Sequence, residues 1–294
     1  MNPYEEISLE VIEHYLNTGK YNEVIELVKE QIPSDINNCA LWYMLGYSHY
    51  AIGKYDEAIE QLHEAINLGY DVQVVFPVLG HLFMETEQWQ EAEAFFLEVL
   101  RLNPSNADTH ASYAKLMRIT GHRKKSKFFI EKAMELNSES IHVLRNYFTL
   151  EGLSGNKKQR ILALQQYMNS ADSELAKLLK LGWNASLQHK EKEAKEYYRQ
   201  AFLLTPEDKA LFSILEGMEI SAHPLLGPNR IINRMGGIVV VWITMLLAIF
   251  PLELFGLESL INPFLQLLLF ITLYIFISIP LVKGLERIKN YRHR

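Results

Sequence analysis

Residues 42–65 read WYMLGYSHYAIGKYDEAIEQLHEA, and the same arrangement of large and small residues returns 34 positions later. The first copy holds Trp42, Leu45, Gly46, Ala58, Leu62 and Ala65, and the second holds Phe76, Leu79, Gly80, Ala92, Phe96 and Val99. Spacings of three and four place such residues on one face of a helix, and the small ones let two helices approach closely. The pattern therefore predicts a pair of antiparallel helices in each copy.

The period of 34 residues continues on both sides of these two copies. It divides the chain without a gap into six repeats, 5–38, 39–72, 73–106, 107–140, 141–174 and 175–208. Single glycines recur between the two helices expected in a repeat, at Gly19, Gly53, Gly121 and Gly155. Glycine adopts left-handed backbone most readily, so we expect tight turns at these positions.

These offsets resemble the tetratricopeptide repeat family, whose pattern reads W-x2-L-G-x2-Y, then A-x3-F, then P. The resemblance implies an all-α fold, a right-handed helical solenoid closed by a capping helix over 207–220. It is strongest in 39–106 and 175–208. It departs in 141–174, where Glu151, Arg160 and Asp172 replace the family's aromatic residue, alanine and proline.

Two segments carry further local predictions. Pro77 falls where the first helix of the third repeat should already be under way, so we expect that helix to begin late, with Pro77 in its first turn. Stacked repeats need an end that faces water, because each one leaves an apolar face open. In the capping helix we therefore expect one inward apolar stripe, formed by Leu211, Ile214, Leu215 and Met218.

Long uncharged segments follow the repeats. Residues 264–282 contain no charge, and a helix of this length extends about 28 Å, close to the hydrocarbon core of about 30 Å in a bilayer. A second uncharged segment begins at Met235. We expect transmembrane helices over 235–257 and 264–282, which form a helical hairpin after a linker over 221–234. The alternative is a pair of helices buried in a globular core.

The distribution of Lys and Arg predicts how this hairpin is oriented. Arg230 and Arg234 precede the first segment, residues 283–294 form a basic tail, and the connector between the segments has neither residue type. Because Lys and Arg concentrate on the cytoplasmic side, both termini and the repeats should be cytoplasmic. Inside the spans, we expect hydrogen bonds between helices from the polar residues Thr244, Gln266, Thr272 and Ser278.

The sequence holds no recognisable catalytic or metal-binding pattern. The single cysteine, Cys39, has no second thiol, no histidine pair has zinc-ligand spacing, and glycines do not form a phosphate-binding loop. We therefore expect no enzymatic activity, no cofactor, no metal, no nucleic acid and no small-molecule substrate. What remains is binding to a protein or peptide.

In the tetratricopeptide repeat family, the first helix of each repeat lines a concave groove, chiefly through the second, fifth, ninth, twelfth and thirteenth residues of the repeat. In this chain those positions hold Tyr43, Tyr47, Tyr50, His81, Met84, Lys115, Arg118, Arg145 and Trp183. The tyrosines could serve as contact surface or as packing, and both interpretations stay open. The Lys and Asn set with which some members bind the C-terminal carboxylate of heat-shock chaperones is absent.

Charge is distributed unevenly along the repeats. Residues 1–100 hold 3 Lys and Arg against 18 Asp and Glu, whereas residues 101–200 hold 18 against 10. The cations of the groove could therefore pair with an acidic segment of the partner, or balance the acidic half of the solenoid. The sequence favours a membrane-anchored adaptor or scaffold that binds a protein or peptide in its groove. The alternative is a structural or assembly subunit whose spans pack on partner spans.

Overall fold

The structure is a computed structural model that describes residues 9–153, 156–254 and 261–292. Every regular element in these ranges is a helix. The chain forms two compact units, Met1–Asp172 and Ser173–Arg294. The first unit is built from helix pairs and carries most of the predicted groove residues, whereas the second contains the apolar segments.

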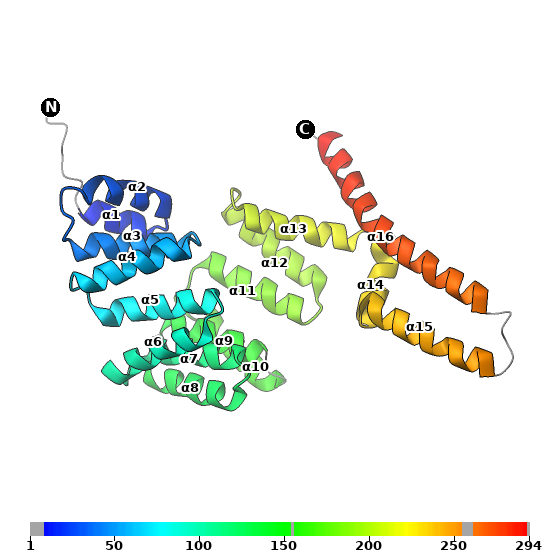
Figure 1. The fold of residues 1–294 in the computed structure, drawn as a ribbon, viewed down its shortest axis with the longest axis horizontal. Helices are drawn as coiled ribbons and strands as arrows, with labels where there is room; N and C mark the ends of the chain where they lie inside the picture. Colours follow the sequence, from blue (N-terminus) through cyan, green and yellow to red (C-terminus); the bar gives the residue numbers. More distant parts are fainter. Residues whose placement is uncertain (1–8, 154–155, 255–260, 293–294) are drawn as a thin grey trace. The chain divides into compact units, whose positions relative to one another are not determined.

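The first unit consists of consecutive helix pairs, in which each helix packs against the one that follows it (Figure 1). The helices are α1 Leu9–Asn17, α2 Tyr21–Gln31, α3 Cys39–Ala51, α4 Tyr55–Asn67, α5 Val72–Glu85, α6 Trp89–Leu102, α7 Ala107–Ile119, α8 Arg123–Leu136, α9 Ile141–Gly152 and α10 Lys157–Met168. Helices α3, α5, α7 and α9 also contact one another in that order, so they form a continuous layer.

The sequence marks where the helices of this layer begin. A side-chain oxygen accepts a hydrogen bond from a backbone N–H of the first turn at Asn38 before α3, Asp71 before α5, Asn106 before α7 and Ser140 before α9. Such caps stabilise a helix start by about 1 kcal/mol each, because they satisfy N–H groups that have no partner inside the helix.

The turns inside the helix pairs use left-handed backbone, as the glycine pattern predicts. Gly19, Gly53 and Gly121 have φ angles of 75°, 80° and 85°. Glu87 adopts the same conformation between α5 and α6 with a φ of 59°, although it is not a glycine. The prediction is thus confirmed at three positions, and Gly155 lies outside the described residues.

Close contact between the helices of a pair depends on glycine. A Cβ atom built on Gly46 of α3 would lie 2.9 Å from Cγ of Leu62 in α4. At Gly80 of α5 the Cβ would lie 2.7 Å from Cε1 of Phe96 in α6. Leu62 and Phe96 are fully buried, so each large side chain fills the space that the glycine leaves.

The prediction for Pro77 is wrong. Helix α5 begins at Val72, so Pro77 lies in its second turn rather than its first. Asp71 fixes the start, because its Oδ1 accepts a hydrogen bond of 2.9 Å from the N–H of Gln73. The helix thereby forgoes the hydrogen bond that residue 77 would donate, and burial of Val75, Val78 and nearby apolar residues offsets this loss.

The second unit begins with helices of the same kind and ends in apolar ones. Its elements are α11 Glu174–Leu187, α12 Glu191–Leu204, α13 Lys209–Ala222, the 3-10 turn η1 Pro224–Leu226, α14 Gly227–Arg234, α15 Gly237–Leu254 and α16 Ile261–Arg292. Gly182 packs against the ring of Tyr198, as Gly80 packs against Phe96 in the first unit. In α13, Leu211 is buried, but Ile214 is 44% exposed, so the predicted stripe does not include Ile214.

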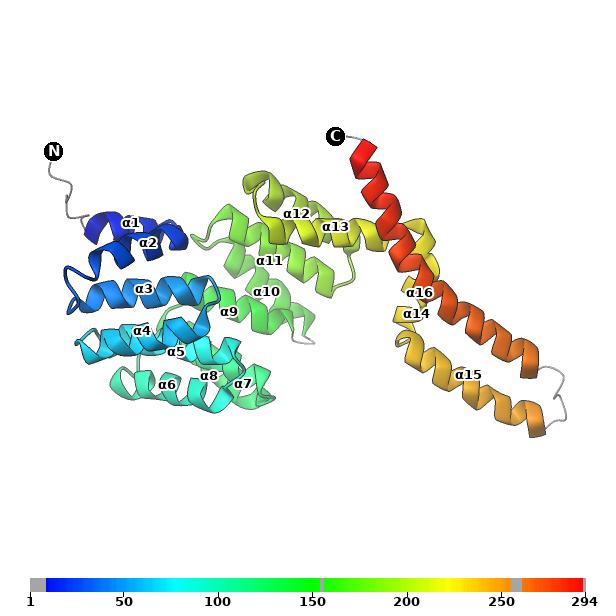
Figure 2. The ribbon, with the colours of Figure 1, turned by 45° about the horizontal axis from the view of Figure 1, so that its top comes forward.

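Helices α15 and α16 run alongside each other as a hairpin in both views (Figures 1 and 2). Residues 261–284 of α16 are long and apolar enough to span a bilayer. Trp242 Nε1 donates a hydrogen bond of 3.1 Å to Thr272 Oγ1, and Asn229 Nδ2 donates one of 2.9 Å to Ser278 Oγ. The predicted hydrogen bonds between helices are confirmed for Thr272 and Ser278, whereas Thr244 bonds to its own helix.

Candidate functional site

Eight of the nine predicted groove residues lie on the layer of helices α3, α5, α7 and α9. Helix α3 carries Tyr43, Tyr47 and Tyr50, α5 carries His81 and Met84, α7 carries Lys115 and Arg118, and α9 carries Arg145. Trp183 lies on α11 in the second unit, where Lys180 Nζ lies 5.8 Å from the centroid of its ring. We use the term wall for the face of α3, α5, α7 and α9 that carries these eight residues.

Tyrosines from four segments meet at the α3 end of the wall. The rings of Tyr43 and Tyr70 stack with centroids 4.5 Å apart, and Tyr47 lies 6.0 Å from Tyr43 and 6.1 Å from Tyr50. Tyr21 extends the cluster next to Tyr47, and Tyr55 extends it next to Tyr50. We call these six residues the tyrosine cluster. All six are half-buried, so each ring packs on its neighbours and still presents surface to solvent.

The hydroxyl groups of the tyrosine cluster make no hydrogen bond within the described residues. Burial, together with the neighbouring tyrosines, raises the pKa of Tyr43 to about 12. Burial also raises the pKa of Tyr50 to about 12, and Glu85 contributes to this rise. Both groups therefore stay protonated at neutral pH and can donate a hydrogen bond to a ligand. The cluster combines apolar ring surface with unused O–H donors, which suits contact with polypeptide.

A polar network connects the next three helices of the wall. Ser112 of α7 lies between His81 of α5 and His142 of α9, with Oγ 3.1 Å and 2.8 Å from the two Nε2 atoms. The Nδ2 group of Asn146 also lies 3.1 Å from His142 Nε2. This arrangement is satisfied when His142 Nε2 accepts from Ser112 and Asn146, and His81 Nε2 donates to Ser112.

The network requires a neutral imidazole at His142, whose Nε2 accepts hydrogen bonds, and burial keeps His81 neutral as well. Burial lowers the pKa of His81 from 6.5 to about 3, with contributions from His142 and Lys115. The ring of His81 also lies edge-on to Phe96, with the centroids 5.3 Å apart. Burial likewise lowers the pKa of His142, although Asp108 acts in the opposite direction. Both rings thus serve as structural links between helices at neutral pH, and neither is poised to bind an anionic ligand as a cation.

The lowered pKa of His81 predicts that the first unit loses stability in mild acid. The unfolded chain binds a proton at His81 below about pH 6.5, whereas the folded chain does not until about pH 3. The free energy of unfolding should therefore fall by about 2 kcal/mol between pH 7 and pH 5 from this group alone. Urea denaturation at both pH values measures the loss.

The variant His81→Asn should show a smaller difference in the free energy of unfolding between pH 7 and pH 5 than the unchanged chain, because asparagine does not titrate. The control is His63→Gln, which changes an exposed histidine of α4. If His81→Asn and the unchanged chain lose the same stability on acidification, His81 is not buried as a neutral group.

The remaining groove residues differ in how accessible they are. Lys115 is half-buried, and no described residue accepts a hydrogen bond or forms an ion pair with its Nζ. Arg118 Nη2 donates a hydrogen bond of 3.0 Å to the carbonyl oxygen of Leu153 at the end of α9. Met84 is 5% exposed and packs in a core cluster with Phe96 and Leu116, so it offers little surface to a ligand.

Arg145 is engaged in a built ion pair. Its guanidinium group binds both carboxylate oxygens of Asp172, and Nε lies 2.6 Å from Oδ2. Tyr167 donates a third hydrogen bond of 2.6 Å to Asp172 Oδ2. The side chain of Asp172 is 2% exposed, and that of Arg145 is 46% exposed. Arg145 thus holds the connection after α10 against α9, which leaves Lys115 as the wall cation without a described partner.

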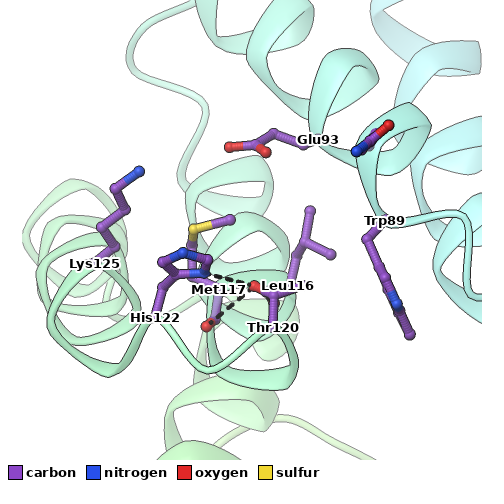
Figure 3. Close-up of a pocket in the computed structure, with 8 residues that line it drawn as sticks. Trp89, Glu93, Leu116, Met117, Thr120, His122 and Lys125 are labelled. Carbon is purple, nitrogen blue, oxygen red and sulfur yellow. Dashed lines mark hydrogen bonds between the residues drawn. The ribbon is translucent and has the colours of Figure 1, made fainter.

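A small depression lies elsewhere in the first unit. Its volume is about 220 Å³, and it is lined by residues of α6, α7 and the start of α8 (Figure 3). Thr120 Oγ1 lies 3.0 Å from His122 Nδ1, but the same hydroxyl also donates a hydrogen bond of 3.0 Å to the carbonyl oxygen of Leu116. These contacts close the end of α7. Pockets for drug-sized ligands are typically larger, from about 300 Å³ upward.

Metal binding has no support in the part of the chain that the structure describes. Within 9–153, 156–254 and 261–292, no group of three His, Cys, Asp or Glu side chains is placed to hold a metal ion. His81 and His142 approach each other, but Ser112 occupies the space between their Nε2 atoms.

Sequence reasoning missed three members of the tyrosine cluster. Tyr21 and Tyr55 are the first residues of α2 and α4, and they are separated by one period, so the repeat offset could have indicated them. Tyr70 lies in the connection before α5. Ser112 and His142 were also missed, and their separations from His81 do not match the period, so the sequence gives no signal for this network.

Comparison with known proteins agrees with the repeat geometry. Residues 39–71 and 78–108 match family models described as tetratricopeptide repeat. These two segments of the chain therefore carry tetratricopeptide repeats. The fold of the chain is an all-helical tetratricopeptide solenoid in the part that resembles this family. Tetratricopeptide proteins in general are scaffolds for protein interaction rather than enzymes. No curated protein matches the chain in sequence.

Solved structures share the solenoid at low sequence identity. A chain of the APC/C hetero-tetramer Cut9–Hcn1 is 12% identical over 79% of this chain and 46% of that one, with a TM-score of 0.58. TTC0263, a thermophilic TPR protein of Thermus thermophilus, is 16% identical over 62% and 99%, with a TM-score of 0.54. PilW, a widely conserved type IV pilus biogenesis factor, is 15% identical over 73% and 100%, with a TM-score of 0.52. These likenesses establish the fold alone.

Proposed function

We propose that this protein is a membrane-anchored tetratricopeptide adaptor that binds a protein or peptide partner along the wall of α3, α5, α7 and α9. The proposal takes six repeats over 5–208 as the binding domain and residues 235–257 and 264–282 as two spans. Both termini lie in the cytoplasm. The observation that carries it is the tyrosine cluster, in which six half-buried rings keep their hydroxyl groups unpaired among the residues described.

The chemistry of the cluster favours a polypeptide ligand. Tyrosine provides a large contact area with few rotatable bonds, so little conformational entropy is lost on binding. The ring faces suit apolar or aromatic side chains of the partner. The hydroxyl groups of Tyr43, Tyr47 and Tyr50 can donate to its backbone carbonyl oxygens or carboxylates.

Charge along the wall favours a partner with an acidic segment next to its apolar part. Lys115 lies on the same wall as Tyr47 and has no carboxylate partner among the residues described. Arg145 contributes less than its position suggests, because Asp172 already neutralises it. We therefore infer that the acidic segment of the partner binds Lys115, and that Arg118 lies at the edge of the same contact.

The apolar hairpin supports the tether. Only 17% of the apolar window within 261–284 is buried, which is not the state of a core helix in a globular domain. Exposed apolar side chains such as Phe270 and Phe276 are stable against lipid but not against water. Flotation of the full chain with phosphatidylcholine liposomes, and loss of flotation after removal of residues 224–294, is the expected behaviour of a tether.

The internal hydrogen bonds of the hairpin favour a tether over a subunit whose spans pack on partner spans. Trp242 donates a hydrogen bond to Thr272, and Nδ2 of Asn229 in α14 donates one to Ser278, although Oδ1 of Asn229 has no partner among the described residues. Few polar groups therefore remain for partner helices, apart from the exposed Gln266. Enzymatic activity is not part of the proposal. Ser112 and His142 lie within hydrogen-bond distance of each other, but Ser112 is 2% exposed, so its hydroxyl group is not open to a substrate.

Binding measurements with wall variants test the proposal. Tyr47→Ala should weaken partner binding at least about tenfold at any salt concentration, because it removes ring surface. Lys115→Glu should weaken binding most at low salt and flatten its salt dependence. The matched control is Lys124→Glu, which makes the same charge change on the exposed side of α8. Equal affinities for all three folded variants and the unchanged chain would mean that the partner binds elsewhere.

A further inference from the structure

A cavity of about 630 Å³ lies in the second unit, where α12, α13 and α14 meet. Its lining is cationic, with Lys192 and Lys195 from α12 and Arg230 from α14. Ser221 and Asn233 add neutral polar groups. The lining includes one carboxylate, that of Glu191, so positive charge is in excess. A cavity of this volume accommodates a group of several non-hydrogen atoms.

The cations of this cavity keep capacity to bind a ligand. Lys192 is exposed and has no partner within the described residues. Arg230 uses Nη1 for hydrogen bonds of 2.7 Å to the carbonyl oxygen of Ser221 and 3.0 Å to that of His223. Its Nε and Nη2 groups make no hydrogen bond to a described residue. Lys195 forms an exposed ion pair of 3.0 Å with Glu219, which a stronger anion can displace.

Two hydrogen bonds from Nη1 hold the guanidinium group of Arg230 in place. The carbonyl groups of Ser221 and His223 end α13 and have no partner inside that helix. Arg230 binds both of them, which fixes its remaining N–H groups in place. A fixed, planar guanidinium with two free donor groups is the arrangement that proteins use for phosphate oxygens.

The cavity adjoins the apolar hairpin. Helix α14 leads into α15 through Gly236 and Gly237, whose φ angles are 102° and 86°. The chain bends by 67° at this point, between residues 224–233 and 237–250. Ile231 of α14 is 61% exposed, although its neighbour Arg230 lines the cavity. This short helix thus has a polar side toward the cavity and an apolar residue facing outward, as helices in the membrane interface do.

We propose that this cavity binds the phosphate group of an anionic phospholipid, with Lys192, Lys195 and Arg230 as its ligands. The inference rests on the proposed tether. It places the cavity at the cytoplasmic surface of the bilayer, where basic side chains meet lipid head groups. The phosphate group accounts for the excess of cations, and the acyl chains can follow the exposed apolar surface of α14 and α15. A soluble phosphate compound would make no use of that surface.

Lipid titration of the full chain tests this site. In detergent solution, native mass spectrometry should show phosphatidylglycerol bound at least about tenfold more tightly than phosphatidylcholine. The choline cation of phosphatidylcholine cancels the charge of its phosphate, whereas phosphatidylglycerol keeps a net negative charge for the basic residues to attract. Lys192→Gln should reduce the affinity for phosphatidylglycerol about fivefold, and Lys192→Gln with Lys195→Gln about 25-fold. The control is Lys209→Gln, which removes an exposed lysine at the opposite end of α13 and should leave the affinity unchanged.

Three results would contradict the proposal. They are equal binding of the two lipids, an affinity that Lys192→Gln does not change, and inorganic phosphate binding as tightly as phosphatidylglycerol, which would assign the cavity to a soluble anion. Flotation separates this failure from that of the tether. A chain that floats with pure phosphatidylcholine liposomes but shows no preference for phosphatidylglycerol retains the tether without the lipid site. A chain that does not float lacks both.

Discussion

Asp172→Ala is expected to lower the free energy of unfolding of the first unit by about 3 kcal/mol. The side chain of Asp172 is 2% exposed, and its carboxylate accepts two hydrogen bonds from Arg145 and one from Tyr167. Its loss removes the carboxylate that accepts the hydrogen bond from the buried hydroxyl of Tyr167. This loss of unfolding free energy lies near the lower end of the range for breaking a buried ion pair, because the half-exposed guanidinium of Arg145 can be hydrated again. Urea denaturation monitored by circular dichroism measures the change.

Tyr167→Phe is the matched control for this ion pair. It removes one hydroxyl group, keeps the ring that stacks on Phe148, and leaves the pair of Asp172 and Arg145 intact. We expect a loss of about 1 kcal/mol, the usual contribution of one hydrogen bond. If Asp172→Ala costs no more than Tyr167→Phe, the ion pair does not hold α9 and α10 together, and Arg145 is available to a ligand after all.

Gly80→Val should destabilise the first unit by about 3 kcal/mol. A Cβ atom at residue 80 would lie 2.7 Å from Cε1 and 2.9 Å from Cζ of Phe96, which is fully buried and has no room to withdraw. Helices α5 and α6 must therefore separate, or the phenyl ring must leave its rotamer. Thermal and urea denaturation of the full chain both report the loss.

Gly217→Val provides the control, because Gly217 also lies inside a helix but has no atom within 4 Å of a built Cβ. Valine and glycine differ little in helix propensity, so we expect a change of less than about 0.5 kcal/mol. Equal effects of Gly80→Val and Gly217→Val would show that the glycine at position 80 is not required for close packing of α5 and α6.

The repeat fold could be predicted because one spacing carries it. Gly46 and Leu62, and one period later Gly80 and Phe96, stand at equal offsets in the sequence and pack in the same way in the structure. Left-handed turns could be predicted only where the sequence places glycine. Glu87 adopts the same backbone without being a glycine, because the repeat geometry imposes the turn whichever residue occupies it.

Pro77 shows where local rules fail. A proline alone suggests a helix start, but the cap at Asp71 and the buried residues Val75 and Leu79 together fix an earlier one. A missing hydrogen bond in one turn is a smaller effect than the loss of several buried apolar side chains.

The candidate site could be predicted only in part. The position of Tyr43, Tyr47 and Tyr50 on α3 follows from helical spacing, but the contact between Tyr43 and Tyr70 depends on how the connection before α5 folds back. The offset of Arg145 indicated a groove cation, yet the sequence could not show that Asp172, 27 residues away, would neutralise it. Asp172 was visible in the sequence as a departure from the family pattern. In the structure, this unusual residue is the ion-pair partner of Arg145.

Site-specific photo-crosslinking in native membranes tests the central claim most directly. A photoreactive residue is placed at Tyr47 on the wall, and in a separate variant at Phe128, which is 62% exposed on α8. We expect a crosslinked protein partner in the membrane fraction from position 47 and none of that mass from position 128. Competition with a peptide from the identified partner should remove the crosslink. Equal crosslinking from both positions, or crosslinking from position 128 alone, would contradict binding along the wall.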